Sequence, residues 1–236
     1  MSETALVIGV GPGLGAALGR RFAAAGMNLA LCARHSEFLE TLAQEINQAG
    51  GNARAYSADC TDESAVISLF ARVQAELGDP DLVVYNAGAF QPTGILEASA
   101  AEFERCWRVG CFGGFLAGRE AAKIMAARGS GTLLFTGATA SIRGGAGFFN
   151  LAVGKFGLRA LAQSMARELG PGGVHVAHVI IDGQINGPGH AQQASERGAD
   201  ALLAPEAIAE TYYQLHRQHR SAWTQEIDLR PWVAKY

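Results

Sequence analysis

The sequence predicts a doubly wound α/β fold, in which helices flank a parallel sheet of about seven strands. Two observations support this prediction. The chain contains short apolar runs that end in glycine or polar residues, as buried strands do. These runs alternate with longer segments whose apolar residues recur every three or four positions, as in helices. The connections between consecutive strands are then helical crossovers, which are right-handed and make the strands parallel. The chain of 236 residues fits one such domain, and we expect the domain to span residues 1–236.

The composition is that of a globular protein and narrows the range of partners. Apolar residues make up 49% of the chain and charged residues 17%, and the net charge of −3 comes without a basic cluster. This balance argues against nucleic acid or a membrane as the main partner. No apolar run approaches the length of a membrane span, and the N-terminal run lacks the basic residues of a signal peptide. The four cysteines have no C-x-x-C spacing, so we expect reduced thiols and a cytoplasmic location.

The N-terminal segment is typical of a nucleotide-binding turn. Ala5–Ile8 predicts a buried strand, the glycine-rich stretch Gly9–Gly15 follows, and Leu14–Phe22 has helical periodicity. Glycines let the backbone approach a pyrophosphate, whose charge the free N–H groups and the dipole of the helix start would stabilise. Two dinucleotide-binding patterns fit, G-x-G-x-x-A and G-x-x-x-G-x-G, although a tight turn between strand and helix also requires glycine for structural reasons alone.

The second strand and the residues after it predict which nucleotide binds. Met27–Cys32 is a second apolar run, and Arg34 follows it at the distance where such folds contact the adenosine ribose. An acidic residue there would bind the 2′-hydroxyl of NAD, whereas an arginine can pair with a 2′-phosphate. We therefore expect NADP(H) in preference to NAD(H); the alternative is that Arg34 is a solvated loop cation. Ser36 is expected to cap a helix that continues to Gln48.

Two further strands end in residues that are candidates for the same site. Arg54–Ser57 is followed by Asp59, which either accepts a hydrogen bond from the adenine amino group or is a turn residue before the helix Ser64–Leu77. Asp81–Tyr85 is the fourth strand, and Asn86 follows it. In such Rossmann-type sheets ligands bind beyond the carboxyl ends of the strands, so we expect the turns after these strands to form one nucleotide site.

The rest of the chain continues the alternation of helices and strands. We expect helices over 101–127, 149–169 and 205–219 and strands over 131–136, 174–181 and 223–229. His175 and His178 face opposite sides of a strand, and His216 and His219 lack further metal ligands nearby, so we expect no metal site. Aromatic residues near the C-terminus line either a substrate pocket or a subunit interface: Trp223, Trp232 and Tyr236.

These motifs resemble the short-chain dehydrogenase/reductase family over nearly the whole chain. The family's glycine motif is matched by Gly9, Gly13 and Gly15, its N-A-G motif by Asn86-Ala87-Gly88 and its active-site lysine by Lys155. The resemblance implies hydride transfer to or from a nicotinamide cofactor, a small-molecule substrate, a mobile lid near residues 183–203, and a homodimer or homotetramer with the two long helices at an interface. The residues assigned to cofactor binding are Gly9, Gly11, Gly13, Leu14, Gly15, Arg34, Asp59, Cys60, Asn86, Ala87, Gly88, Lys155 and Ile185.

The chain departs from the family at the residues that move protons. In the family a tyrosine four residues before the lysine transfers a proton to or from the substrate oxygen, a serine polarises that oxygen, and an asparagine supports a proton-relay water. Leu151, Ala138 and Gly110 occupy these positions here, and Asp182-Gly183 stands where the family usually has Pro-Gly. Loss of a general acid costs about 10²- to 10⁴-fold in rate, so we do not expect an ordinary alcohol dehydrogenase mechanism.

Hydroxyl residues close to the serine position are candidate substitutes. Thr139 or Ser141 can orient a substrate oxygen, with Lys155 giving electrostatic help or relaying a proton through water; these three residues are the predicted catalytic set. The alternative is that both hydroxyls bond to loop backbone groups, as loop serines and threonines commonly do. Asn150 and Asn186 are further polar residues that can reach the same space.

Two functions of different kinds follow from these observations. The first is an NADP(H)-dependent oxidoreductase that transfers hydride to or from a small, activated carbonyl, enone or imine, because such a substrate needs little acid assistance. The second is a catalytically inactive family member that binds NADP(H) and acts as a cofactor sensor or assembly partner. Cofactor binding is common to both, because it depends on the glycine turn and the strand ends.

Overall fold

The structure is a computed structural model that describes residues 2–190, 196, 198 and 200–234. Its centre is a seven-stranded sheet in the order β3-β2-β1-β4-β5-β6-β7, in which every neighbouring pair of strands is parallel. The strands span Thr4–Ile8 (β1), Asn28–Ala33 (β2), Asn52–Ser57 (β3), Leu82–Tyr85 (β4), Gly131–Thr136 (β5), Val174–Ile181 (β6) and Glu226–Leu229 (β7). The predicted doubly wound parallel sheet is confirmed.

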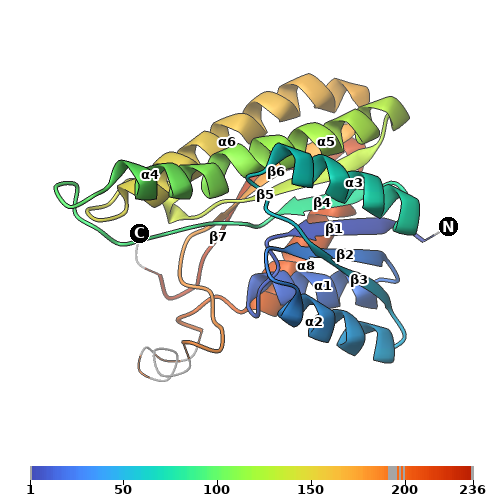
Figure 1. Ribbon diagram of the computed structural model, residues 1–236, viewed down its shortest axis with the longest axis horizontal. Helices are drawn as coiled ribbons and strands as arrows, with labels where there is room; N and C mark the ends of the chain where they lie inside the picture. Colours follow the sequence, from blue (N-terminus) through green and yellow to red (C-terminus); the bar gives the residue numbers. More distant parts are fainter. Residues whose placement is uncertain (1, 191–195, 197, 199, 235–236) are drawn as a thin grey trace.

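Helices cover both faces of this sheet. The main helices span Leu14–Ala24 (α1), Ser36–Gln48 (α2), Glu63–Leu77 (α3), Ala100–Trp107 (α4), Gly113–Arg128 (α5), Phe149–Leu169 (α6) and Pro205–His216 (α8). Figure 1 shows α1, α2 and α8 on one side of the sheet and α3, α5 and α6 on the other. Each side encloses its own apolar core, with Phe22 and Tyr212 buried in one and Phe70 and Phe135 in the other. No helix in the described part of the chain is long and apolar enough to cross a membrane.

Two helices begin at a residue different from the one expected. The limits expected for β5, β6 and α6 are confirmed. The N-cap of α2, however, is His35, and Ser36 is the first residue of the helix, so the predicted Ser36 cap is wrong. Helix α3 begins at Glu63 rather than Ser64, because the Asp62 carboxylate caps it by accepting a backbone N–H at 3.0 Å.

The long helix predicted over 101–127 is in fact two helices, α4 and α5, joined by a π-helical turn at Arg108–Phe112. Within this turn the Val109 carbonyl accepts a hydrogen bond from the buried Tyr85 hydroxyl at 2.6 Å. The turn packs closely against α6 at Gly110 and Gly154, since a Cβ on Gly154 would lie 3.3 Å from Gly110 Cα. Apolar periodicity does not reveal such a turn, because it reports only the average helical repeat.

The strand order places a crevice at one end of the sheet. The order reverses between β1 and β4, and ligands of such sheets bind beyond the carboxyl ends of the strands at this point. In Figure 1 the loops that leave these strand ends lie together. The two ends of the expected lid 183–203 also meet there: Ile185 bridges Leu203, and the Asn186 N–H donates to the Leu203 carbonyl at 2.8 Å. Residues 191–195, 197 and 199 of that segment lie outside the described residues.

Candidate functional site

The glycine turn after β1 is held by β2 and by the loop after β4. Gly9 has a φ of +97°, a conformation that favours glycine, and its N–H donates to the Cys32 carbonyl at 2.9 Å. The Asn86 side chain donates to the Gly9 carbonyl at 2.9 Å. A Cβ on Gly9 would lie 2.4 Å from the Ala87 backbone nitrogen, so a larger residue does not fit.

The other glycines of this turn differ in what surrounds them. A Cβ on Gly15 would lie 2.6 Å from Val10 Cα, so Gly15 allows α1 to approach the turn closely. Around Gly11 and Gly13, by contrast, no described atom lies within 4 Å of such a Cβ. These two residues border open space at the N-terminus of α1, where free N–H groups favour an anion. The turn therefore provides the cradle that a pyrophosphate requires.

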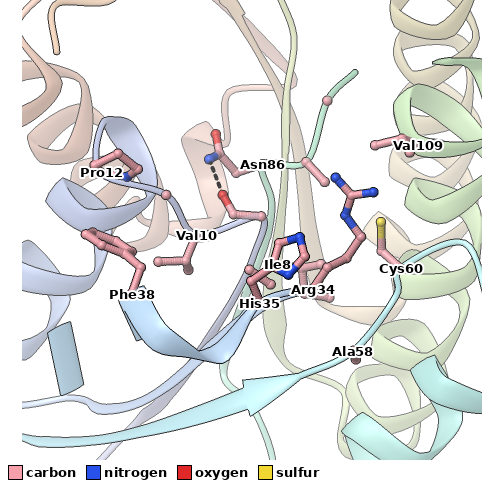
Figure 2. Close-up of a pocket in the computed structure, with 15 residues that line it drawn as sticks. Ile8, Val10, Pro12, Arg34, His35, Phe38, Ala58, Cys60, Asn86 and Val109 are labelled. Atoms are coloured by element: carbon pink, nitrogen blue, oxygen red, sulfur yellow. Dashed lines mark hydrogen bonds between the residues drawn. The ribbon is translucent and has the colours of Figure 1, made fainter. Parts of the chain in front are cut away.

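A cavity of about 420 Å³ extends from this turn to the residues after β2. Figure 2 shows the Arg34 guanidinium pointing into this cavity, in the space between Asn86 and Cys60. Among the described residues the Arg34 guanidinium has no hydrogen-bond or ion-pair partner. An unpaired guanidinium at this end of a dinucleotide cavity suits a 2′-phosphate, which it can bind with two hydrogen bonds.

A second cavity of about 520 Å³ continues from the glycine turn to Lys155. Gly88 lies close to this lysine, since a Cβ on it would be 3.8 Å from Lys155 Nζ. Thr136 and Gly137 at the end of β5 also line the cavity, together with residues 185–190. Both cavities share residues of the glycine turn, so they adjoin there, as the binding of an extended dinucleotide would require.

The cofactor residues expected from the sequence lie around these cavities, with one difference. Each of them lines one cavity or the other except Asp59. Asp59 Oδ1 accepts hydrogen bonds from the Thr61 N–H and the Thr61 hydroxyl, both at 2.8 Å. Of the two roles considered for Asp59, the structure thus shows the turn role, and a bond to adenine stays a prediction.

Lys155 is buried at the second cavity, with 5% of its surface exposed. Its Nζ donates to the Thr136 carbonyl at 2.6 Å. Burial lowers the pKa of Lys155 from 10.5 to about 8, because the charged form loses its hydration. The amine therefore exists in both protonation states near pH 8, which suits a group that gives and takes a proton.

Ser141 is fully buried, and its hydroxyl is engaged. Its Oγ accepts the Ala138 N–H at 3.0 Å and lies 3.3 Å from His178 Nε2. His178 Nδ1 lies 3.0 Å from the carboxylate of Glu226, which also pairs with Arg159 at 2.7 Å. Burial lowers the pKa of His178 to about 4, so the imidazole is neutral and can donate to Glu226 while it accepts from Ser141. Ser141 thus has the backbone-bonding role that was the alternative for it, and we do not assign it to substrate contact.

Thr139 differs from Ser141 because its hydroxyl bonds to a side chain. Its Oγ1 donates to Asp182 Oδ1 at 2.5 Å. Asp182 follows β6 directly and also pairs with Arg230 at 3.1 Å. Both Thr139 and Asp182 are partly exposed, whereas Ser141 is fully buried.

The remaining polar candidates bond to the backbone, and aromatic residues stand near them. Asn150 donates to the Gln91 carbonyl at 2.6 Å, and Asn186 accepts the N–H of the next residue at 2.9 Å. Phe90 and Phe148 stack with their ring centroids 4.7 Å apart. This stack joins the loops that follow β4 and β5 and presents an apolar surface beside them.

The C-terminal aromatic residues have separate environments. Trp223 stacks on His175 with ring centroids 4.9 Å apart, whereas Trp232 is 80% exposed and Tyr236 lies outside the described residues. His219 caps a short 3₁₀ turn by accepting the Ser221 N–H. Within the described ranges no three His, Cys, Asp or Glu side chains are grouped to hold a metal ion.

Several residues of the first cavity were missed by the sequence reasoning. His35, Phe38 and Val109 line it beside Arg34. The position of His35 next to Arg34 was a usable signal, whereas Phe38 has the apolar spacing of a core residue of α2. Val109 reaches the cavity from the π-helical turn, for which the sequence has no clear signal.

Comparison with known proteins agrees with this geometry. The family model described as short chain dehydrogenase matches residues 3–197. Sorbitol-6-phosphate 2-dehydrogenase of Escherichia coli (strain K12) is 30% identical over 216 residues, which cover 90% of this chain and 83% of that protein. The crystal structure of a short-chain dehydrogenase from Rhodopseudomonas palustris is 41% identical, with a TM-score of 0.85 over 98% of this chain and 99% of that one. A metagenomic short-chain oxidoreductase in complex with NADP is 27% identical, with a TM-score of 0.86 and 99% coverage of both chains.

Proposed function

Because this chain belongs to the short-chain dehydrogenase/reductase family, we propose that it is an NADP(H)-dependent oxidoreductase that transfers hydride to or from a small, activated carbonyl, enone or imine. Membership of this family implies that the protein is of the oxidoreductase class and binds NAD(P). The observation that carries the preference for NADP(H) is the unpaired Arg34 guanidinium in the cavity. The NADP complex of the metagenomic relative supports it.

Different residues of the two cavities would bind different parts of the cofactor. The glycine turn and the start of α1 would bind the pyrophosphate, Arg34 the 2′-phosphate, and Lys155 the nicotinamide half. When bound, the nicotinamide accepts or supplies the hydride. Asn86 keeps the turn in shape through its bond to the Gly9 carbonyl, and Lys155 holds a proton whose release is easy near pH 8.

The proposed substrate class follows from the groups that the chain lacks near Lys155. Leu151, Ala138 and Gly110 stand where the family's tyrosine, serine and asparagine are expected, and none of these side chains can donate a proton. A carbonyl, enone or imine that is already polarised needs the least help from such a site. The exposed Phe90–Phe148 stack suits a small apolar substrate.

The first test follows the hydride. Purified protein is incubated with NADPH that carries deuterium on the transferred position and with a small-metabolite extract, and products are searched for deuterium by mass spectrometry. Protein-dependent label in a product supports the proposed function and identifies the substrate class. No label transfer, with NADPH shown to bind in the same sample, contradicts it and favours the inactive NADP(H)-binding alternative. A Lys155→Ala variant is run beside it, with its NADPH affinity measured separately.

A variant that restores the family's tyrosine and serine tests whether the absence of a general acid limits the reaction. Leu151→Tyr combined with Ala138→Ser places a phenol four residues before Lys155 and a hydroxyl at the serine position. We expect the double variant to reduce a simple ketone at least about 10²-fold faster than the wild type, measured as NADPH consumption. The matched control, Leu151→Phe with Ala138→Ser, lacks the phenol and should gain little. If only the double variant turns over any acceptor, the native protein is a binder rather than an enzyme.

We also propose that the protein is a homodimer or homotetramer in the cytoplasm. The support for assembly is the outer face of the helices α4, α5 and α6, which leaves large apolar side chains exposed: Phe103, Trp107, Phe115, Val153 and Phe156. The support for the location is the set of cysteines without paired spacing, which is typical of reduced thiols.

A further inference from the structure

Two segments meet beside the second cavity, at the ends of β5 and β6. Thr139 begins the short 3₁₀ turn Thr139–Ser141 after β5, and Asp182 directly follows β6. The Thr139 hydroxyl donates to the Asp182 carboxylate over 2.5 Å, and the Asp182 side chain is only 17% exposed. A hydrogen bond to a carboxylate in such a shielded place is stronger than one between neutral groups, so it holds the Thr139 hydroxyl in one orientation.

The second oxygen of Asp182 has its own partner. Arg230 Nη2 lies 3.1 Å from Asp182 Oδ2, whereas Thr139 binds Oδ1, and Arg230 also pairs with Asp228. A carboxylate paired with arginine accepts hydrogen bonds and donates none. Thr139 must therefore be the donor in its bond to Asp182. The lone pairs of Thr139 Oγ1 are left to accept a hydrogen bond from a ligand.

The Thr139–Asp182 pair lies next to the residues proposed to hold the cofactor. Gly137 precedes Thr139 on the same loop and lines the cavity, and so does Ile185, which follows Asp182 along the chain. Lys155 lines the same cavity. Thr139 and Asp182 do not line the cavity themselves, but residues two before Thr139 and three after Asp182 do, so the pair lies at the border of the site.

We propose that Thr139 contacts the reacting hydroxyl or amine of the substrate and that Asp182, acting through Thr139, receives its proton. This inference rests on the proposed function and narrows it: the substrate donates a hydrogen bond to Thr139, so it is a small secondary alcohol or amine that is oxidised with NADP⁺. As the C–H bond breaks and its electron pair leaves as hydride to the nicotinamide, the O–H or N–H bond also breaks. That proton passes to Thr139 Oγ1, the original Thr139 proton passes to Asp182, and the carbon gains a double bond to oxygen or nitrogen. Reduction follows the same path backwards.

The kinetic test compares variants of the full-length protein with NADP⁺ and three apolar secondary alcohols whose ketones are conjugated: 1-tetralol, 1-phenylethanol and 2-cyclohexen-1-ol. We expect Thr139→Val and Asp182→Asn to lower kcat about 10²-fold or more, and Thr139→Ser to stay near the wild-type rate. Asp228→Asn is the matched control, because Asp228 shares Arg230 with Asp182 but is not the partner of Thr139. In Asp182→Asn the rate should rise about tenfold per pH unit as hydroxide replaces the carboxylate, more steeply than the rate of the wild type.

A binding test needs no turnover. In the complex with NADPH an alcohol has no hydride acceptor, so its affinity alone is measured, by ligand-observed NMR. We expect each alcohol to bind wild type and Asp228→Asn about fivefold more tightly than its methyl ether does, and this difference to disappear in Thr139→Val.

The outcomes separate this inference from the function on which it rests. Equal losses in Asp182→Asn and Asp228→Asn would show that Asp182 only anchors Arg230, and they would overturn the inference. So would equal affinities of the wild type for all three alcohols and their ethers. If deuterium transfer from NADPH is seen in that case, the proposed function still stands. If NADPH binds but there is neither deuterium transfer nor alcohol oxidation, both are overturned.

Discussion

Arg34 and Lys155 are both cations of the candidate site, but their surroundings give them different chemistry. Arg34 is exposed and has no hydrogen-bond or ion-pair partner for its guanidinium within the described part of the chain, so its donors are available to an anion. Lys155 is buried, and its Nζ hydrogen bond goes to the Thr136 carbonyl. Loss of hydration lowers the pKa of Lys155 to about 8 and makes its charge depend on pH around that value.

Replacement of Arg34 tests the preference for the phosphorylated cofactor. We expect Arg34→Ala to weaken NADPH binding by about 2 kcal/mol, or roughly 30-fold, because a charge-assisted pair with the 2′-phosphate is lost. NADH binding should hardly change, and fluorescence titration measures both. Arg54→Ala is the control, since Arg54 is an exposed arginine that already pairs with Glu76 at 3.1 Å. Unchanged NADPH affinity, or an equal loss for NADH, would contradict the role of Arg34.

Replacement of Lys155 tests its lowered pKa through stability. The pKa of Lys155 is about 8 in the folded protein and 10.5 in the unfolded chain, so between these values only the unfolded chain holds the proton. The free energy of unfolding of the wild type should therefore rise with pH in this window relative to Lys155→Met, by up to about 1.4 kcal/mol per pH unit. Urea unfolding of both apoproteins from pH 7 to 10.5 measures the difference. A difference that is independent of pH would mean that Lys155 keeps an ordinary pKa.

At the scale of the elements, the turn between β1 and α1 contains glycines with two different structural roles. Gly9 and Gly15 are required by packing, since their Cβ atoms would meet backbone atoms of Ala87 and Val10. Gly11 and Gly13 border open space and are free of such contacts. The first pair therefore builds the turn, and the second pair leaves room for the ligand.

This distinction predicts that one alanine substitution lowers the stability of the apoprotein and that another weakens NADPH binding. Gly9→Ala places a side chain at a φ of +97° and 2.4 Å from the Ala87 nitrogen, so the apoprotein should lose about 2 to 3 kcal/mol, or roughly 5 to 10 °C in Tm. Gly11→Ala should leave the apoprotein Tm unchanged and weaken NADPH binding, because its Cβ enters the space proposed for the pyrophosphate. Calorimetry and NADPH titration of both variants test this. Equal Tm losses would show that both glycines are structural.

For the whole molecule, the two faces of the sheet differ in what covers them. The helices α1, α2 and α8 enclose one core, and α3, α5 and α6 enclose the other (Figure 1). On the second side, exposed aromatic and aliphatic residues remain on the outer face of α4, α5 and α6. Exposed apolar patches of this kind are typical of interaction surfaces.

A charge placed on this face tests assembly. We expect the wild type to be a dimer or tetramer and Phe156→Glu with Val153→Glu to yield a smaller species, because carboxylates at an apolar interface are costly to desolvate. Light scattering after size-exclusion chromatography measures the mass. Ile67→Glu, on α3, is the control, because Ile67 is 45% exposed like Val153 but lies outside the proposed interface. A monomeric wild type would contradict the proposal.

Strand and helix identities could be predicted from the sequence because they depend on local periodicity and on glycine. The strands β5 and β6 and the helix α6 have the limits expected, and the glycine turn, Arg34 and Lys155 lie around one pair of cavities as expected. The π-helical turn at Arg108–Phe112 was not predictable, because its contacts come from Tyr85 and from α6. The same is true of Val109 in the cavity.

By itself, the sequence determined the doubly wound sheet, the nucleotide cavity and the lack of a tyrosine before Lys155, because each of these features depends on residues that are close together in the chain. The tertiary structure alone decided between Thr139 and Ser141, two hydroxyl residues of one loop. Ser141 turns inward to His178, and Thr139 bonds to Asp182, a residue 43 positions away. Such partners are far apart in the chain and are brought together only when β5 and β6 pair, so no local pattern distinguishes the two hydroxyls.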